Sequence, residues 1–263
     1  MVVQSALWAQ MTTNRPSERT ISVGIKGGVN QPRMYYYNNP VLQQLPQSFV
    51  FTPTGGLFVD IPLSEWVYLA PEVDYVQRGT KTNYVHQPSG ATVNYSILTH
   101  NVDLRVPLEL VWPVKPYFQP YLTLGAEAGM CLAGQIHLDR TEPIAFDQTL
   151  AVDSANMQMI HAGAFAGLGI RSKVTIGYQD ILLKLGASIH QGFLDSYSKY
   201  EKDGTVHAVN VNAYQISGSR LPQGLEVTLG IAIPLKPQLK DACATFAKDR
   251  SYRRGTHGHL FGY

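Results

Sequence analysis

Charged residues recur at alternate positions of otherwise apolar segments, and they are the residues that could do chemistry in this sequence. Glu72 is followed two residues later by Asp74, and Asp103 by Arg105. Because alternate residues of a strand share one face, this spacing collects charges on that face. Buried charges persist only when they are paired and hydrogen-bonded, so we expect a mixed-sign network with the planar guanidinium of Arg105 at its centre. The predicted members are Lys26, Glu72, Asp74, Arg78, Asp103, Arg105, Glu109, Glu127, Lys184 and Glu226.

Catalytic or metal-binding groupings are weak by comparison. His161 and His190 fall on the charged faces, but acid–base catalysis needs a nucleophile or a paired constellation, and hydrogen-bonded structural histidines are the favoured interpretation. His257 and His259 form a His-x-His pair that lacks the further ligands of a stable metal site. The sequence has no phosphate-binding loop, Cys-x-x-Cys pair or Gly-x-Ser-x-Gly elbow. We therefore predict no catalytic residue, no metal and no cofactor.

Eight segments carry the alternation that would position these side chains. In the clearest, aliphatic residues from Val102 to Leu110 alternate with Asn101, Asp103, Arg105 and Glu109. The expected strands span residues 20–30, 54–61, 66–78, 98–111, 117–132, 160–171, 181–191 and 224–235. Period-two alternation predicts strands with two chemically different faces. Several of them reach the roughly 9–11 residues that a tilted strand needs to cross a bilayer.

The connections between these strands alternate in length. Short connections are expected at residues 62–65, 112–116 and 172–180, and long polar ones at residues 31–53, 79–97, 133–159 and 192–223. An up-and-down antiparallel barrel with turns at one end and loops at the other produces this order. Since the interior of an eight-stranded barrel is just wide enough for side chains, we expect the charged network to plug the lumen.

Alternation does not by itself say which face points outward. In a soluble lipocalin-like barrel the aliphatic face would line a pocket for a small apolar ligand, whereas in a membrane barrel it would face lipid. The aliphatic faces hold almost nothing polar, and glycine, a poor residue on an exposed strand surface, is frequent on the charged faces. Aromatic residues near the short connections suit an interfacial girdle: Trp66, Tyr68, Trp112, Tyr117 and Phe118. These features favour a transmembrane barrel over the soluble alternative.

Composition is compatible with a β protein and excludes other classes. Charged residues make up 15% of the 263 residues, and the chain holds 23 glycines and 15 tyrosines. No run of about 18 apolar residues occurs, which excludes a transmembrane helix. The formal net charge of +2 gives no preference for nucleic acid.

Three parts are expected along the chain: a residual signal segment and N-terminal arm at residues 1–19, the barrel at 20–235 and a basic tail at 236–263. The segment from Ala6 to Ala9 fits the small-x-small pattern of a signal cleavage site, which would make Gln10 the first mature residue. A disordered arm is the alternative. With both ends of the barrel on the short-turn side, both termini are expected in the periplasm and the long loops outside the cell.

The tail carries six lysine and arginine residues against two aspartates. A solvated, disordered extension and a docking peptide for a periplasmic or membrane partner are both open interpretations. For docking, the expected contacts are Arg253, Arg254, Leu260, Phe261 and Tyr263. Cys243 lies in this tail and Cys131 near the loop end of a strand. Because about a bilayer thickness would separate them, we expect no disulfide.

Several short motifs occur in an order that resembles the outer-membrane β-barrel domain family of Bacteroidetes, often called PorT-like. The matching segments are 27–30 (GGVN), 54–57 (TGGL), 69–75 (LAPEVDY), 77–79 (QRG), 104–110 (LRVPLEL), 115–117 (KPY) and 125–129 (GAEAG). The resemblance spans roughly residues 21–235 and rests on the order of the motifs, because no single motif is specific. It implies an eight-stranded outer-membrane barrel without catalytic residues, and some relatives belong to type IX secretion and gliding machinery. The tail departs from simple members of the family, which end close to the last strand.

The expected function is therefore that of a non-enzymatic barrel, held in outer-membrane lipid, which anchors or assembles a cell-envelope complex. A soluble barrel that binds an apolar ligand is the second hypothesis, and an outer-membrane enzyme is the third. The aromatic residues of segments 35–39 and 193–200 fit either a recognition surface or a cover for the barrel mouth.

Overall fold

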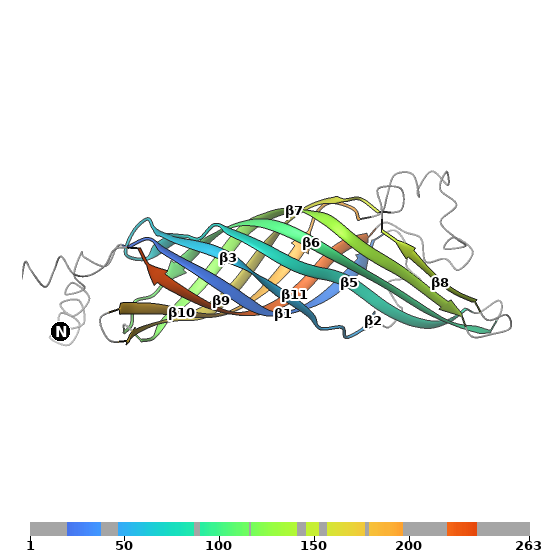
Figure 1. The fold of residues 1–263 in the computed structure, drawn as a ribbon, viewed down its shortest axis with the longest axis horizontal. Helices are drawn as coiled ribbons and strands as arrows, with labels where there is room; N and C mark the ends of the chain where they lie inside the picture. The colour runs from blue at the N-terminus through green and yellow to red at the C-terminus, as the bar shows by residue number, and fades with distance from the viewer. Residues whose placement is uncertain are drawn as a thin grey trace, which may run out of the picture.

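The computed structural model describes residues 20–37, 47–86, 90–115, 117–140, 146–152, 157–176, 179–196 and 220–235. Within these ranges, strands form a single antiparallel sheet that closes on itself (Figure 1). The predicted N-terminal segment, residues 1–19, and the predicted tail, residues 236–263, lie outside the described residues. Among the residues described, no helix is long and apolar enough to cross a membrane.

The barrel is a ring of eight strands in the described part of the chain. In chain order these are β1 (Ser22–Tyr36), β3 (Thr52–Pro62), β5 (Glu72–His86), β6 (Ala91–Val111), β7 (Gln119–Arg140), β9 (Ile160–Ile176), β10 (Gln179–Gly192) and β11 (Arg220–Pro234). Each pairs antiparallel with its neighbours in sequence, and β1 closes the ring by pairing with β11. This is the up-and-down order that the lengths of the connections predict.

Short strands supplement the ring. β4 (Val67–Leu69) pairs with both β3 and β6, so it continues the path of β5 below a break at Ala70 and Pro71. The break keeps its neighbours paired, because Ala70 N donates to the carbonyl of Pro107 at 3.0 Å. β2 (Gln47–Ser48) pairs with the C-terminal part of β5, and β8 (Phe146–Ala151) pairs with the C-terminal part of β7.

The two faces of the wall separate charge from aliphatic side chains. On β6, Arg105 is 2% exposed, whereas its neighbour Leu104 is 55% exposed. The outward aliphatic residues form a belt around the barrel, the apolar belt, which includes Val23, Ile25, Val29, Leu57, Val73, Leu104, Val106, Leu108, Leu122, Leu124, Leu168, Leu185, Ile189, Leu225, Val227, Leu229 and Ile231. A soluble barrel with an aliphatic pocket has the opposite arrangement, so the lipocalin-like hypothesis is wrong.

Aromatic residues border the belt at both ends. At the end with the short connections, the turn end, Trp66, Trp112, Tyr117 and Phe118 are exposed. Tyr68, which we expected in this girdle, instead faces the lumen, where the guanidinium carbon of Arg171 lies 4.0 Å from the centre of its ring. At the opposite end, the loop end, the exposed aromatic residues among those described include Tyr35, Tyr37, Phe49, Phe51 and Phe193.

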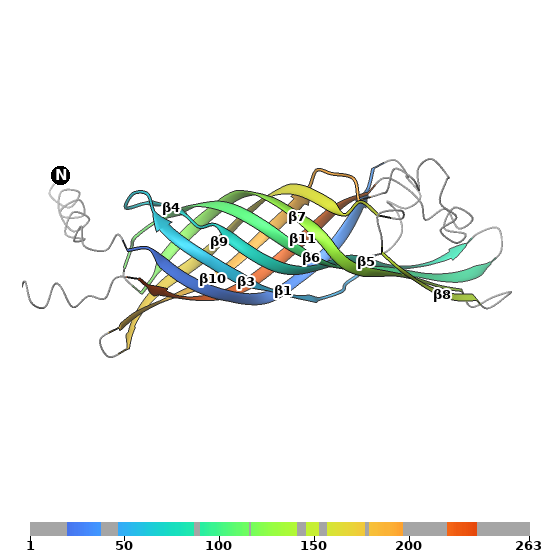
Figure 2. The same cartoon turned by 45° about the horizontal axis from the view of Figure 1, so that its top comes forward.

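Several strands extend further toward the loop end than the sequence predicts. Of residues 79–97, expected as a loop, residues 79–86 belong to β5 and residues 91–97 to β6, and the two strands pair as far as His86 and Ala91. Within residues 133–159, also expected as a loop, residues 133–140 belong to β7 and residues 146–151 form β8. Figure 2 shows β5, β6, β7 and β8 projecting together beyond the rest of the barrel wall. At the turn end, residues 172–180 are mostly strand, because β9 and β10 pair up to Ile176 and Gln179.

The ends of the barrel domain meet at the turn end. Ser22 at the start of β1 lies opposite Pro234 at the end of β11. At the loop end, inward apolar side chains form a cluster, the apolar cap, beside the buried Arg220, which donates to the hydroxyl of Tyr95 at 3.3 Å. Its members are Met34, Tyr36, Val93, Tyr95, Ile97, Cys131, Ile136, Leu138, Val152 and Met157. Tyr36 is 3% exposed, so this aromatic residue of segment 35–39 covers the barrel mouth, whereas Tyr35 and Tyr37 are exposed.

Candidate functional site

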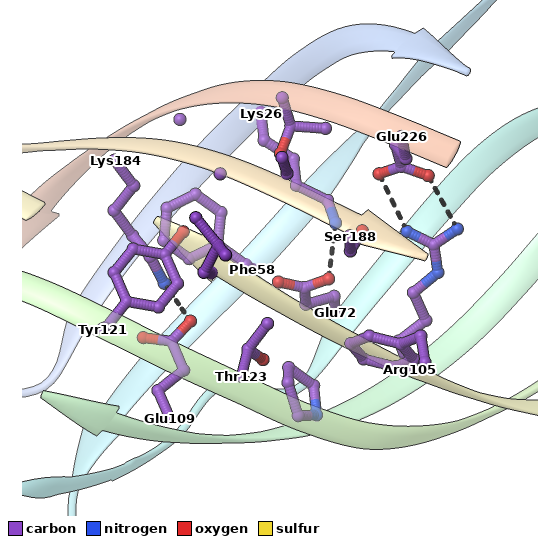
Figure 3. A pocket seen from close by; sticks show the side chains of 17 residues that line it. Lys26, Phe58, Glu72, Arg105, Glu109, Tyr121, Thr123, Lys184, Ser188 and Glu226 are labelled. Atoms are coloured by element: carbon purple, nitrogen blue, oxygen red, sulfur yellow. Dashed lines mark hydrogen bonds and ion pairs between the residues drawn. The ribbon is translucent and has the colours of Figure 1, made fainter. Parts of the chain in front are cut away.

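The centre of the lumen is organised around Arg105. Its two terminal nitrogens each lie 3.0 Å from an oxygen of Glu226, in a bidentate pair between β6 and β11. Asp74 Oδ2 lies 3.0 Å from the same guanidinium, and Glu127 Oε2 lies 3.4 Å from its Nε. Lys26 contacts Glu72 and lies 2.8 Å from Asp74. Figure 3 shows the Lys26–Glu72 and Arg105–Glu226 contacts beside a small cavity.

A second group lies nearer the turn end and centres on Lys184 of β10. Its Nζ is 2.6 Å from Glu109 and 3.0 Å from Asp60. Arg171 donates to the second Asp60 oxygen at 3.1 Å. The ammonium also lies 4.8 Å from the centre of the Phe58 ring, within reach of a cation–π interaction. Asp60 is only 1% exposed, so these contacts provide the partners that a buried carboxylate requires.

A third group lies nearer the loop end. Arg78 joins Asp103 at 2.5 Å to Glu127 at 3.1 Å. His161 Nε2 is 2.7 Å from the other oxygen of Asp103, and His190 Nδ1 is 2.8 Å from Glu127. Both histidines therefore make structural hydrogen bonds to carboxylates. Through Glu127 and Asp103, this group is continuous with the contacts of Arg105.

Every strand of the ring contributes to these three groups, which together we call the lumen network. All ten residues predicted from the sequence to form the network lie in it. Four further residues also belong to it: Asp60, His161, Arg171 and His190. Asp60 carries the same signal as the others, because it lies two residues from buried Phe58 and next to outward Val59. The proposed tail contacts, Arg253, Arg254, Leu260, Phe261 and Tyr263, lie outside the described residues, as does Cys243.

Glycines make space for large side chains of the lumen. A Cβ added to Gly186 would lie 2.6 Å from the hydroxyl of Tyr121, and one at Gly24 would lie 2.5 Å from the ring of Phe58. At Gly129 the added atom would meet Asp103 Oδ1 at 2.3 Å. The glycines on the charged faces are therefore a packing requirement of a filled interior, in agreement with the inward placement of these faces.

Between the first and second groups lies a cavity of about 50 Å³, lined by Lys26, Phe58, Glu72, Arg105, Tyr121, Lys184 and Glu226 among others (Figure 3). A space of this size and polarity suits one or two water molecules. It is far smaller than the ~300–1,000 Å³ of a usual small-molecule site. The lumen therefore offers no room here for an apolar ligand.

Three side chains of the lumen are arranged like a catalytic triad, and the sequence does not predict this arrangement. Ser188 Oγ lies 2.9 Å from His190 Nε2, and His190 Nδ1 lies 2.8 Å from Glu127. This is the order of nucleophile, base and acid. However, Ser188 lines the cavity of about 50 Å³, which is too small for a substrate. His190 is also stacked on Phe165, at 5.2 Å between ring centres, and is 5% exposed. The contacts hold the imidazole within the lumen network.

Metal binding has no support in the described residues, where no three histidine, cysteine, aspartate or glutamate side chains are placed to hold an ion together. Cys131 is a free, buried thiol that donates to the carbonyl of Ala133 at 3.3 Å.

Residues 8–198 match the model of a protein family described as the outer membrane protein beta-barrel domain. The chain belongs to this family. The apolar belt and the two aromatic girdles are thus those of a barrel in a bacterial outer membrane. No curated protein matches the sequence.

Several solved structures match most of this chain at low sequence identity and with low TM-scores. Neisserial surface protein A is 10% identical, with 81% of this chain and 97% of that chain covered and a TM-score of 0.37. Ail, the attachment invasion locus protein of Yersinia pestis, is 10% identical, with 81% and 97% covered and a TM-score of 0.32. The translocator domain of the autotransporter NalP from Neisseria meningitidis is 11% identical, with 88% and 96% covered and a TM-score of 0.32.

Proposed function

We propose that this outer-membrane barrel is a closed, non-enzymatic anchor that holds the segments outside the membrane in a cell-envelope complex. The observation that carries the proposal is the filled lumen. Its charged side chains lie within ion-pairing distance of one another, and the apolar cap covers them at the loop end. A conducting pore needs a continuous aqueous path, which a lumen packed in this way does not offer.

A rigid wall suits a barrel whose task is to hold other parts in place. The lumen network takes members from all eight ring strands, so each strand is linked to others through side chains as well as through the backbone. Breaking one such buried pair typically costs about 3–5 kcal/mol. The network therefore opposes separation of the strands at the expense of any transport route.

The proposed orientation places the loop end outside the cell and both ends of the barrel domain in the periplasm. Bacterial barrels of this class have short periplasmic turns and longer extracellular segments. The short connections and the paired ends of β1 and β11 lie at one end of this barrel, which supports the assignment. Protease added to intact cells should then cleave within the loop-end connections and spare an epitope placed after Tyr263. Loss of the epitope would contradict the orientation.

The proposed partner is a periplasmic or membrane protein that contacts the basic tail through Arg253, Arg254, Leu260, Phe261 and Tyr263. The resemblance to the Bacteroidetes PorT-like family supports a role near type IX secretion or gliding machinery. A pull-down of the full chain from mild detergent tests this, with a variant that ends after Pro237 as the comparison. A matched variant keeps the tail and replaces Leu260, Phe261 and Tyr263 by serine. The proposal fails if all three capture the same partners.

Conductance tests the closed lumen directly. The full chain, inserted into a planar bilayer, is expected to give no large and stable current steps. Such steps, present with this protein and absent from a preparation of an unrelated closed barrel, would contradict the proposal. A fluorophosphonate probe tests the non-enzymatic assignment, because it should leave Ser188 unmodified in the folded barrel. Labelling of Ser188 in folded protein would favour an enzyme instead.

A further inference from the structure

A hollow of about 620 Å³ crosses the outer wall of the barrel over β7, β9, β10, β11 and β1. We call it the wall trough. One of its edges is a row of outward residues that lie opposite one another in register from strand to strand. This row consists of Leu124, Ala166, Ile189, Leu225 and Gln31. The other edge is formed in the same way by Ala164, Gln191, Gln223 and Arg33. The trough therefore follows the direction of hydrogen bonding across the strands.

Small side chains explain why the wall is hollow here. Ala164 and Ala166 lie on β9 between the larger Leu124 and Ile189 of the neighbouring strands. With strands about 4.8 Å apart, five adjacent strands give the trough a length of about 19 Å. Because half of a hydrocarbon core is about 15 Å thick, an inclined trough of this length extends over roughly one leaflet.

The chemistry of the trough changes along its length. At β7 and β9 it is lined by Leu124, Ala164 and Ala166, within the apolar belt. At β10 and β11 it reaches two amides, where Gln223 Nε2 donates to Gln191 Oε1 at 2.6 Å. At β1 it ends beside Arg33, whose guanidinium carbon lies 5.3 Å from the ring centre of exposed Phe49 in the loop-end girdle. The trough thus leads from lipid-tail depth to headgroup depth.

The polar end has unused hydrogen-bonding capacity among the described residues. Gln31 Nε2 is buried from solvent and donates no hydrogen bond to any of them. Arg33 is exposed, and its planar guanidinium is suited to two parallel hydrogen bonds with a phosphate. An anionic headgroup at this point would therefore contact one cation and one free amide donor. Both lie at the end of the trough that is furthest from its apolar part.

We propose that the wall trough binds one acyl chain of a phosphorylated outer-leaflet glycolipid and that Arg33 contacts a headgroup phosphate. The inference rests on the proposed orientation, since only with the loop end outside does Arg33 lie in the outer leaflet. The apolar half of the trough matches an acyl chain, and the positive charge of Arg33 matches the phosphate. The amides between them match the polar groups that link chain and headgroup in such a lipid.

Native mass spectrometry of the full chain in mild detergent tests the proposal, with bis-phosphorylated, hexa-acylated lipid A as the probe. The wild-type protein is expected to retain one lipid A molecule. Ala166→Phe fills the trough and Arg33→Gln removes its cation, so each should lower retention by about tenfold or more, the loss expected when a charge-assisted or well-packed contact is removed. The matched controls are Leu57→Phe, at an outward position of β3, and Lys81→Gln on β5. Both control variants should retain lipid A as the wild type does.

Each alternative occupant gives a distinct result. Equal retention by wild type, Ala166→Phe and Arg33→Gln would overturn the site. Equal retention of phosphatidylglycerol or of dephosphorylated lipid A would overturn the assignment to a phosphorylated glycolipid. A dimer that Ala166→Phe dissociates would identify a second copy as the occupant instead. Lipid retention in detergent depends neither on the orientation of the barrel nor on the tail. Failure of the proposed anchor function would be recognised by the pull-down, and a reversed orientation by the protease experiment.

Discussion

Loss of Arg105 should destabilise the lumen network strongly, because this side chain contacts Asp74, Glu127 and Glu226 at the same time. Replacing it with methionine keeps much of its volume but leaves these buried carboxylates short of positive charge. We expect Arg105→Met to lower the free energy of unfolding by about 3–5 kcal/mol, measured by denaturant titration in lipid vesicles. The control Lys81→Met, at an exposed site, should change it by less than about 0.5 kcal/mol. A loss under about 1 kcal/mol for Arg105→Met would show that the network does not stabilise the barrel.

Gly186 offers a test of how tightly the lumen is packed around its aromatic side chains. The only close contact of an added Cβ is the hydroxyl of Tyr121 at 2.6 Å, while the next atom, on Thr228, is 3.7 Å away. Overpacking of this kind costs about 1–3 kcal/mol, so Gly186→Ala should destabilise the barrel by that amount. In a Tyr121→Phe background the same substitution should cost clearly less, as read from a double-mutant cycle of unfolding free energies. Equal costs in both backgrounds would place the strain elsewhere.

At this scale the sequence identifies which residues face inward but not which of them meet. Period-two spacing is enough to nominate Arg105 and Glu226, because strand geometry fixes the face of each residue. Their pairing joins β6 to β11, which are not adjacent in the ring, so it depends on the barrel radius and on rotamers that no local pattern encodes. The contact of His190 with Glu127 also joins two strands that are not adjacent, β10 and β7, so the sequence does not predict it either.

The strands themselves were predictable only where one face meets lipid. All eight ring strands are recognisable from the contrast between aliphatic and charged positions, and this contrast ends where the wall leaves the apolar belt. Along β5, inward Thr80 and Thr82 and outward Lys81 and Asn83 are all polar, so the outer half of the strand carries no alternation to read. Its Thr and Tyr residues favour strands, and Gly90, just before β6, has the left-handed conformation (φ 64°) that glycine adopts readily.

A β-bulge explains why β7 was expected to end at Leu132. The register with β6 shifts between His100 and Asn101, which leaves Leu132 without a partner. An extra residue of this kind changes the inward positions from odd to even numbers. Ile136 and Leu138 therefore point into the apolar cap, although the alternation before the bulge would place them outside. The sequence pattern breaks at this point while the strand continues to Arg140.

The apolar cap can be tested through its own cysteine. Cys131 is 3% exposed and belongs to this cluster, so in a Cys243→Ser background it should react slowly with maleimide. Ile97→Ala or Ile136→Ala removes buried volume worth about 2–5 kcal/mol, and opening of the cap should speed labelling more than about tenfold. The matched control is Leu98→Ala, at an outward position beside Ile97, which should leave the rate unchanged. Equal rates in all variants would mean that the cap does not shield the thiol.

On the scale of the whole molecule, the apolar belt, the lumen network and the apolar cap lead to one arrangement. The belt fixes the barrel in lipid, the network joins its eight strands, and the cap separates the network from the loop end. In eight-stranded barrels the interior is filled by side chains. Side chains that form ion pairs across the lumen occupy the space that a transport path would need. Interaction is then expected on the outer wall, where the wall trough lies, or on segments beyond the membrane, where we propose that the tail lies.

Membrane placement makes a prediction that a soluble barrel of identical shape does not share. Leu229 lies near the middle of the belt on β11 and Val85 lies on β5 beyond the loop-end girdle, and both are 56% exposed. An arginine at the bilayer midplane costs about 2–4 kcal/mol, whereas an arginine in water at an exposed site costs almost nothing. Leu229→Arg should therefore lower the free energy of unfolding in lipid vesicles by about 2–4 kcal/mol, and Val85→Arg should leave it within about 0.5 kcal/mol of the wild type. Because the two positions are equally exposed in the barrel itself, only surrounding lipid can produce this difference. Equal, small effects at both sites would mean that the belt does not lie within the hydrocarbon core.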